Sequence, residues 1–210
     1  MRTAFSADGT VIAFDQFGDG PPVIMAAGAF NTRAATEPLA RALQGQFSVL
    51  NYDRRGRGDS GDTAPYAVDC EIEDLGVLIT AAGGSASVFG YSSGATLALR
   101  AAAAGLASTH LVLYEPPFRP GLEAIAHTLA YDAAVTGDMS LPARLLASVT
   151  APALVICGEQ SPPMLQAAAR AVAETMPNGR LCELAGQTHD ISPEAAAPVI
   201  ADFLTSEPPA

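Results

Sequence analysis

Apolar residues along the chain follow two alternating patterns. Short runs of β-branched and other apolar residues, such as residues 22–28 and 85–90, predict strands, and the first of these is expected to be buried on both faces. Longer alanine-rich runs of helical period, such as residues 162–176, lie between them. Strands that alternate with helices are typical of a parallel sheet covered by helical crossovers on both faces. The pattern therefore predicts an α/β fold.

The predicted elements follow one another with short connections. Strands are expected at residues 2–7, 10–18, 22–28, 47–53, 85–90, 110–115, 153–159 and 180–186. Helices are expected at residues 32–43, 67–82, 95–104, 162–176 and 193–204, and a short helical insertion at about 116–150. The first two strands are separated by Asp8-Gly9, a common hairpin dipeptide, so they are expected to pair with each other.

Composition and charge indicate how many domains the chain forms, which classes of partner it is expected to bind and in which compartment it is expected to act. With 210 residues, 49 % of them hydrophobic, the chain is expected to form one domain over residues 1–210. The net charge of −11 disfavours nucleic acid and anionic membranes as partners. The first ten residues lack the basic and apolar segments of a leader, which predicts a cytoplasmic protein. We expect it to act on a small molecule as a monomer or a homodimer. The three cysteines show no paired spacing, so neither a zinc site nor a disulfide framework is expected.

Ser92 is the candidate nucleophile. The run Gly90-Tyr91-Ser92-Ser93-Gly94 fits G-x-S-x-G, and it lies between a predicted strand and a predicted helix. Side chains at the two glycine positions would collide with the neighbouring strand and helix, and Ser92 alone has a glycine two positions away on each side. Such a turn lifts the hydroxyl above the carboxyl ends of the strands and places the Ser93 N–H at the start of a helix, where it can stabilise an oxyanion.

The order of several short motifs resembles the α/β-hydrolase superfamily over nearly the whole chain. These motifs are AAGAF, YDRRGRGDSG, GYSSG, YEPP, CGEQSPP and GQTHD. More narrowly, the chain is similar to the lipase-like and esterase-like members that carry a small lid after the sixth strand. The resemblance implies an eight-stranded, mostly parallel sheet with helices on both faces. It also implies a Ser-His-acid triad, without metal or cofactor.

Three histidines compete for the role of general base. His110 opens a strand and is expected at the opposite edge of the sheet from Ser92, and His127 lies in the predicted insertion, where packing inside the lid is the simpler interpretation. His189 follows the last strand, at the same edge as Ser92. Similar hydrolases carry the catalytic histidine in this loop, and their chain order places it after the serine. His189 is therefore the predicted base.

The acid departs from the common pattern of the family. Most relatives have an aspartate three residues after the glycine that follows the seventh strand, but Ser161 stands there in this chain. Some relatives take the acid from the end of the sixth strand, where this chain has Glu115. We favour Glu115 and keep Glu159 as the alternative. Asp190 is disfavoured because the neighbouring residue rarely reaches the same imidazole ring.

Two loops complete the predicted site. In similar proteins a His-Gly-x loop supplies a backbone N–H to the oxyanion hole, and here Ala27-Gly28-Ala29 takes its place. We expect the Ala29 and Ser93 N–H groups to form the hole, with Phe30 and Tyr91 contacting the substrate. The loop at residues 53–62 lacks the spacing of a phosphate-binding loop, so Asp53, Arg54 and Arg57 are expected to pair internally.

The expected activity is hydrolysis of a carboxylic ester or thioester of a small to mid-sized substrate, through an acyl-enzyme on Ser92. A serine at the turn argues against the epoxide hydrolase and dehalogenase branches, which use aspartate. The same scaffold also supports acyl transfer, cyclisation, carbon–carbon cleavage and perhydrolysis. A receptor that has lost turnover is a further alternative, suggested by Ala27 and Ser161. The insertion residues Leu122, Ile125, Leu129 and Tyr131 could face the substrate or pack among themselves.

Overall fold

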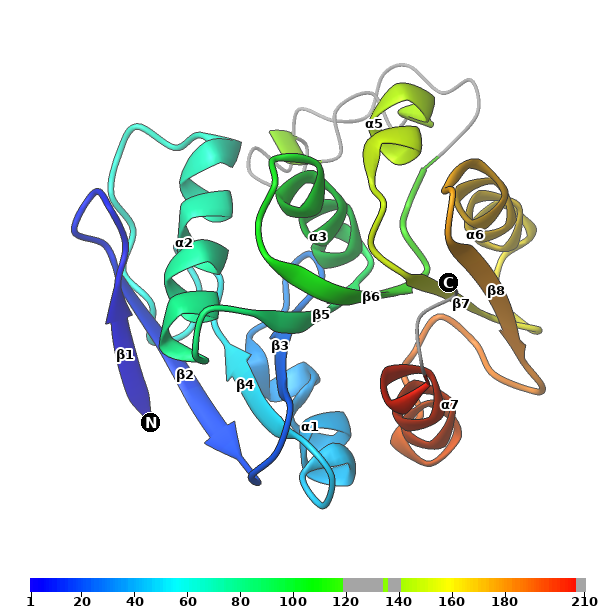
Figure 1. The fold of residues 1–210 in the computed structure, drawn as a ribbon, viewed down its shortest axis with the longest axis horizontal. Helices are drawn as coiled ribbons and strands as arrows, with labels where there is room; N and C mark the ends of the chain where they lie inside the picture. Colours follow the sequence, from blue (N-terminus) through cyan, green and yellow to red (C-terminus); the bar gives the residue numbers. More distant parts are fainter. Residues whose placement is uncertain (119–133, 136–140, 207–210) are drawn as a thin grey trace.

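A single sheet of eight strands organises the structure, which is a computed structural model that describes residues 1–118, 134–135 and 141–206 (Figure 1). The strands are β1 (Arg2–Phe5), β2 (Val11–Phe17), β3 (Pro22–Ala26), β4 (Ser48–Tyr52), β5 (Ala86–Tyr91), β6 (Ser108–Tyr114), β7 (Ala153–Gly158) and β8 (Gly179–Leu184). They lie in the order β1-β2-β4-β3-β5-β6-β7-β8. The first two strands and the β2–β4 pair are antiparallel, whereas all pairs from β4 to β8 are parallel. The predicted mostly parallel eight-stranded sheet is confirmed.

Helices cover both faces of this sheet (Figure 1). The helices are α1 (Glu37–Leu43), α2 (Val68–Ala81), α3 (Ser93–Ala103), α5 (Ala143–Ser148), α6 (Pro163–Thr175) and α7 (Pro193–Thr205). Helices α1 and α7 pack on one face and contribute Leu39, Leu43 and Ile200 to a core that includes Phe89. Helices α2, α3 and α6 pack on the other face. The central strands β3 and β5 are buried over nearly their whole length and consist mainly of apolar residues, as expected of strands covered on both faces.

The helix expected at residues 32–43 is divided in two. Residues Arg33–Ala35 form one 3-10 turn, and α1 begins only at Glu37, with Pro38 in its first turn. The side chains of Asp53 and Asn51 bind the backbone N–H and the carbonyl of Arg33, at 2.7 Å each. These tertiary hydrogen bonds hold the first turn against β4, which sequence periodicity alone cannot indicate.

The insertion predicted after the sixth strand lies between β6 and β7. Its described residues include α5, whose Leu146 belongs to the core formed with α3 and α6. His127 and the four insertion residues named above as possible substrate contacts lie outside the described residues. The insertion follows the strand end that carries Glu115, so it enters the fold beside the candidate site.

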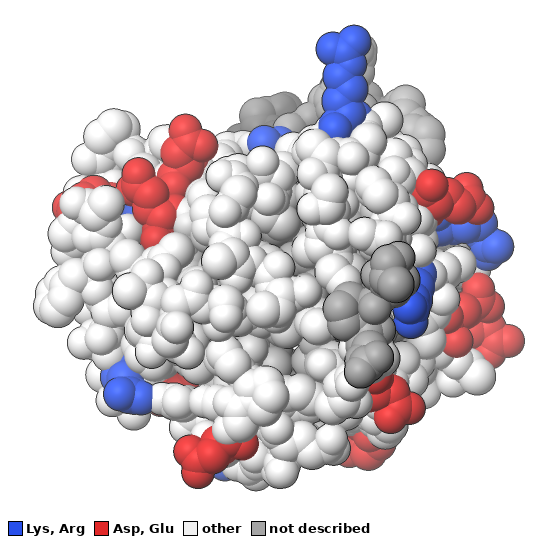
Figure 2. All heavy atoms as spheres, in the orientation of Figure 1, with Lys and Arg blue, Asp and Glu red and all other residues white. Residues whose placement is uncertain are grey.

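Charged side chains on the face shown in Figure 2 lie mainly around its rim, and its centre is uncharged. No helix in the described parts of the chain has both the length and the apolar character needed to cross a membrane.

Candidate active site

Ser92 occupies a strained turn between β5 and α3. Its φ of 53° and ψ of −119° lie in a region that residues with a side chain rarely adopt. The Ser92 N–H donates to the Tyr114 carbonyl at 2.9 Å, which ties the turn to the end of β6. The Ser92 side chain makes no capping hydrogen bond with α3. The hydroxyl is therefore not used by the helix that follows it.

The two glycines around this turn permit a close approach of backbone to backbone. A Cβ atom on Gly90 would lie 2.4 Å from the Gly94 carbonyl oxygen, and one on Gly94 would lie 2.2 Å from the Ala26 oxygen. Both distances are far below van der Waals contact. The prediction that side chains at these positions would collide with the neighbouring helix and strand is confirmed.

Glu115 and His189 are in contact at the carboxyl edge of the sheet. Glu115 directly follows β6, and His189 lies in the loop between β8 and α7. The Glu115 Oε2 atom and His189 Nδ1 form a short hydrogen bond. Since a carboxylate can only accept, this contact assigns the proton to Nδ1 and leaves Nε2 as the acceptor of the imidazole.

Two aromatic rings hold this imidazole in place. The Tyr91 ring lies 5.1 Å from the His189 ring, centroid to centroid, and packs edge-on against the Tyr114 ring at 5.9 Å. The Tyr114 hydroxyl donates to the Thr188 carbonyl at 2.9 Å, one residue before the histidine. Tyr91 is 9 % exposed, and the substrate contact expected of it stays a prediction.

The Glu115 carboxylate is fully buried and is surrounded by donors. Its Oε1 atom accepts from the Gly158 N–H at 2.8 Å and from the Ser161 hydroxyl. Burial raises the pKa of this carboxyl, but the hydrogen bonds from His189, Gly158 and Ser161 outweigh it, so the net pKa lies below the ordinary value. Ser161, three residues after Gly158, thus donates to Glu115, the candidate acid.

Among the described residues, neither alternative acid forms a hydrogen bond or an ion pair with the imidazole. Glu159 is exposed, and its Oε2 atom accepts from the Gly186 N–H at 2.8 Å. Asp190 is also exposed. Of the three acids considered from the sequence, Glu115 is the one in contact with His189. Sequence reasoning missed the supporting donor, Ser161, although the unusual serine at that position was its signal.

The loop after β3 approaches the nucleophile turn from the neighbouring strand. A Cβ atom on Gly28 would lie 3.1 Å from Ser92 Cβ, so this backbone passes directly beside the serine. Ala29 is the next residue in this loop, and Phe30 after it is 81 % exposed with a φ of 58°. Within the described part of the chain, no hydrogen bond joins Ser92 Oγ to His189. Such contacts are often long in free enzymes and tighten when substrate binds.

Asp53, Arg54 and Arg57 of the loop at residues 53–62 bind other residues of the chain, as predicted. Arg54 is buried and forms a two-pronged ion pair with Glu71 of α2, at 2.6 and 2.7 Å. The same guanidinium donates to Ser93 Oγ at 3.0 Å, and Arg57 donates to the Gly28 carbonyl at 2.8 Å. Asp53 forms an ion pair with Arg33. This loop therefore contacts both backbone segments that carry the predicted oxyanion donors.

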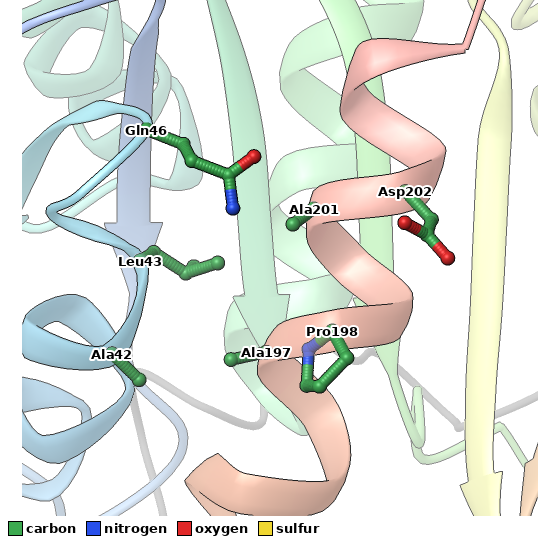
Figure 3. Close-up of a pocket in the computed structure, with 7 residues that line it drawn as sticks. All are labelled: Ala42, Leu43, Gln46, Ala197, Pro198, Ala201 and Asp202. Atoms are coloured by element: carbon green, nitrogen blue, oxygen red, sulfur yellow. The ribbon is translucent and has the colours of Figure 1, made fainter.

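A pocket of about 310 Å³ lies elsewhere, between α1 and α7 (Figure 3). It is lined by Leu43 and Gln46 on one side and by Pro198 and Asp202 on the other. No candidate site residue lines it. Among the described residues, no three histidine, cysteine or acidic side chains gather as metal ligands would.

The arrangement can perform nucleophilic catalysis. Ser92, Glu115 and His189 follow β5, β6 and β8, which all end at one edge of the sheet. The carboxylate can stabilise a charged imidazole, and the imidazole has its Nε2 atom available to take a proton. The Ser93 N–H at the start of α3 and the Ala29 N–H in the loop beside Ser92 are the candidate donors to a reacting carbonyl oxygen.

Comparison with known proteins gives one family and many similar folds. The model of the alpha/beta hydrolase family matches residues 23–193. An alpha/beta hydrolase from Sphaerobacter thermophilus is 41 % identical, with a TM-score of 0.91 over 97 % of this chain and 100 % of that chain. A thermophilic esterase from Thermogutta terrifontis is 19 % identical, with a TM-score of 0.83 over 97 % of this chain and 98 % of its own. An enol-lactonase from Burkholderia xenovorans is 19 % identical, with a TM-score of 0.79 over 98 % and 100 %. No curated protein sequence matches this chain.

Proposed function

Because this chain belongs to the alpha/beta hydrolase family, we propose that it is a serine hydrolase that cleaves a carboxylic ester or thioester of a small to mid-sized substrate. The observation that carries the proposal is the contact between buried Glu115 and His189 at the sheet edge where Ser92 sits on its strained turn. The esterase and the enol-lactonase above share the fold, and they are consistent with this class of reaction.

The proposed first half-reaction acylates the serine. Ser92 Oγ attacks the carbonyl carbon while His189 Nε2 takes the hydroxyl proton, and the Glu115 carboxylate stabilises the resulting imidazolium. The Ala29 and Ser93 N–H groups bind the oxyanion of the tetrahedral intermediate. Its collapse breaks the bond to the leaving group, which departs with the proton held by His189. An ester between the acyl group and Ser92 remains.

The second half-reaction releases the acid. Water attacks the acyl carbon while His189 Nε2 takes one of its protons, and a second tetrahedral intermediate forms in the same oxyanion hole. Its collapse returns the proton to Ser92 Oγ and frees the carboxylic acid. Phe30, exposed directly after Ala29, gives an apolar surface against which part of the substrate can pack.

The test compares the protein with two alanine variants on p-nitrophenyl esters of rising acyl length. We expect Ser92→Ala to lower the hydrolysis rate by about a thousandfold or more, because the acyl-enzyme can no longer form. The matched control is Ser85→Ala, an exposed serine just before the other end of β5, which should leave the rate within about twofold of the wild type.

A fluorophosphonate probe adds a second measurement on the same proteins. The wild type and Ser85→Ala should be modified at Ser92, and Ser92→Ala should stay unmodified. Labelling of Ser92 without hydrolysis of any ester would indicate a different reaction on the same serine. Absence of both labelling and hydrolysis in the wild type would contradict the proposal and favour a non-catalytic receptor.

A further inference from the structure

Arg57 contacts the peptide group that carries a predicted oxyanion donor. Its Nη1 atom donates to the Gly28 carbonyl at 2.8 Å, and that carbonyl belongs to the peptide unit whose N–H is on Ala29. The peptide bond between these residues is trans, since the only cis bond in the described chain is Ala64-Pro65. In a trans peptide the carbonyl and the N–H point in opposite directions. The Gly28 carbonyl also accepts from the Asn31 N–H, at 3.4 Å, so the shorter hydrogen bond from Arg57 and this backbone contact together hold the direction of the Ala29 N–H.

We propose that Arg57 is a positioning residue for catalysis, which orients and polarises the Ala29 N–H of the oxyanion hole through the Gly28 carbonyl. This inference rests on the proposed function and goes beyond the assignment of Ser92, His189 and Glu115. A charge-assisted hydrogen bond to the carbonyl draws electron density from the peptide and makes the N–H at its other end a stronger donor. Ala29 N–H itself makes no hydrogen bond to the described residues, so it is available for an oxyanion.

The backbone of Arg57 is held firmly enough for this role. Its N–H donates to the Arg54 carbonyl at 3.1 Å, and its own carbonyl accepts from the Ser60 N–H at 3.0 Å. Asp53 closes the loop by accepting from the Asp59 N–H at 2.9 Å. A guanidinium anchored on such a loop loses less conformational entropy on binding a carbonyl than one on a mobile chain.

The neighbouring Arg54 contacts Ala27, two residues before Ala29, and Ser93, the other predicted oxyanion donor. Its Nη1 atom lies 3.0 Å from Ser93 Oγ and 3.4 Å from the Ala27 carbonyl, and its other nitrogens bind Glu71. Removal of Arg54 would leave Glu71 buried without its charge partner, which destabilises folds strongly. Arg57 is half-buried, whereas Arg54 is buried against Glu71, so Arg57 is the residue substituted in the test.

The decisive variant is Arg57→Met, which keeps the apolar stem and removes every donor. We expect kcat on p-nitrophenyl esters to fall about 10- to 100-fold with KM within about twofold, because a misoriented donor costs part of the 10²- to 10³-fold effect of losing one. Affinity for a trifluoromethyl ketone, which forms a tetrahedral adduct on Ser92, should fall by a similar factor. Arg57→Lys, which can donate one hydrogen bond to the Gly28 carbonyl, should recover part of the loss.

The control is Arg180→Met, which removes an exposed arginine from β8 and should leave all these quantities unchanged. A readout independent of activity is the amide resonance of Ala29 in a ¹H–¹⁵N spectrum. It should move in Arg57→Met and stay in place in Arg180→Met. An active wild type with kcat of Arg57→Met within twofold overturns the inference. If the wild type hydrolyses no ester, the proposed function fails, and the Ala29 resonance decides the positioning alone: no movement overturns it.

Discussion

Three residues other than glycine have a positive φ within the described part of the chain, namely Phe30, Ser92 and Glu115. Their φ values are 58°, 53° and 46°, and all three are candidate site residues. A backbone in this region costs on the order of 1–3 kcal/mol for a residue with a side chain, so surrounding contacts must hold it. For Glu115 these contacts include its N–H, which donates to the Ile156 carbonyl at 2.8 Å. Strain is thus concentrated where β3, β5 and β6 end.

A single substitution tests whether Glu115 is the acid of the triad. We expect Glu115→Gln to lower kcat by about a hundredfold or more, because a neutral amide cannot stabilise the imidazolium and can hold the wrong tautomer. The measurement is steady-state hydrolysis of a p-nitrophenyl ester at neutral pH, with circular dichroism to show that the fold is kept.

Glu159→Gln is the matched control for this substitution. Its carboxylate is exposed and binds only the Gly186 N–H among the contacts described, so activity should stay within about twofold. Near-normal turnover of Glu115→Gln together with a large loss in Glu159→Gln would assign the acid to Glu159.

The strand-turn-helix unit of β5 and α3 is the element that presents Ser92. Its geometry depends on the contact of Gly94 with the end of β3, because α3 begins against that backbone. The sequence motif predicted this unit correctly, including its boundaries within about two residues. By contrast, the helix predicted at residues 32–43 is interrupted, because contacts with β4 override its helical period.

Two glycines inside helices should respond to alanine with opposite signs. In Gly94→Ala the new Cβ would lie 2.2 Å from the Ala26 oxygen, so the backbone must shift, and we expect a loss of at least about 1–3 kcal/mol in the free energy of unfolding. In Gly76→Ala the nearest atom is Leu106 Cδ2 at 3.9 Å, an ordinary contact. This variant should gain about 0.5–1 kcal/mol from the better helix propensity of alanine. Urea unfolding measures both, and equal effects would contradict the packing described for the turn.

At the scale of the whole molecule, β6 and α7 are joined through His110. Its ring packs edge-on against Phe203 at 5.4 Å, and its Nε2 atom is buried with no hydrogen-bond partner among the described residues. Burial lowers the pKa of this histidine because the charged form is disfavoured away from water. As the pH falls, His110 is therefore protonated in the unfolded chain before it is protonated in the folded chain.

This difference predicts a pH-dependent stability. The contribution of neutral His110 is complete above the unfolded pKa of about 6.5 and is lost as the pH falls toward the lower folded pKa. We expect His110→Leu, which cannot titrate, to lose less stability than the wild type between pH 8 and pH 5.5. Urea unfolding at the two pH values measures it. The same pH dependence in both proteins would show that His110 does not contribute.

Patterns along the sequence were enough to predict the alternation of strands and helices, the parallel sheet, and the positions of Ser92 and His189 at its carboxyl edge. These features follow from local patterns, since hydrophobic period and glycine spacing are written along the chain. The contact of Glu115, rather than Glu159, with His189 is visible only in the folded chain, as are the hydrogen bonds from Ser161 to Glu115 and from Arg57 to the Gly28 carbonyl. Those contacts join residues far apart in sequence, and the direction of a side chain depends on the packing of the strands that bring them together.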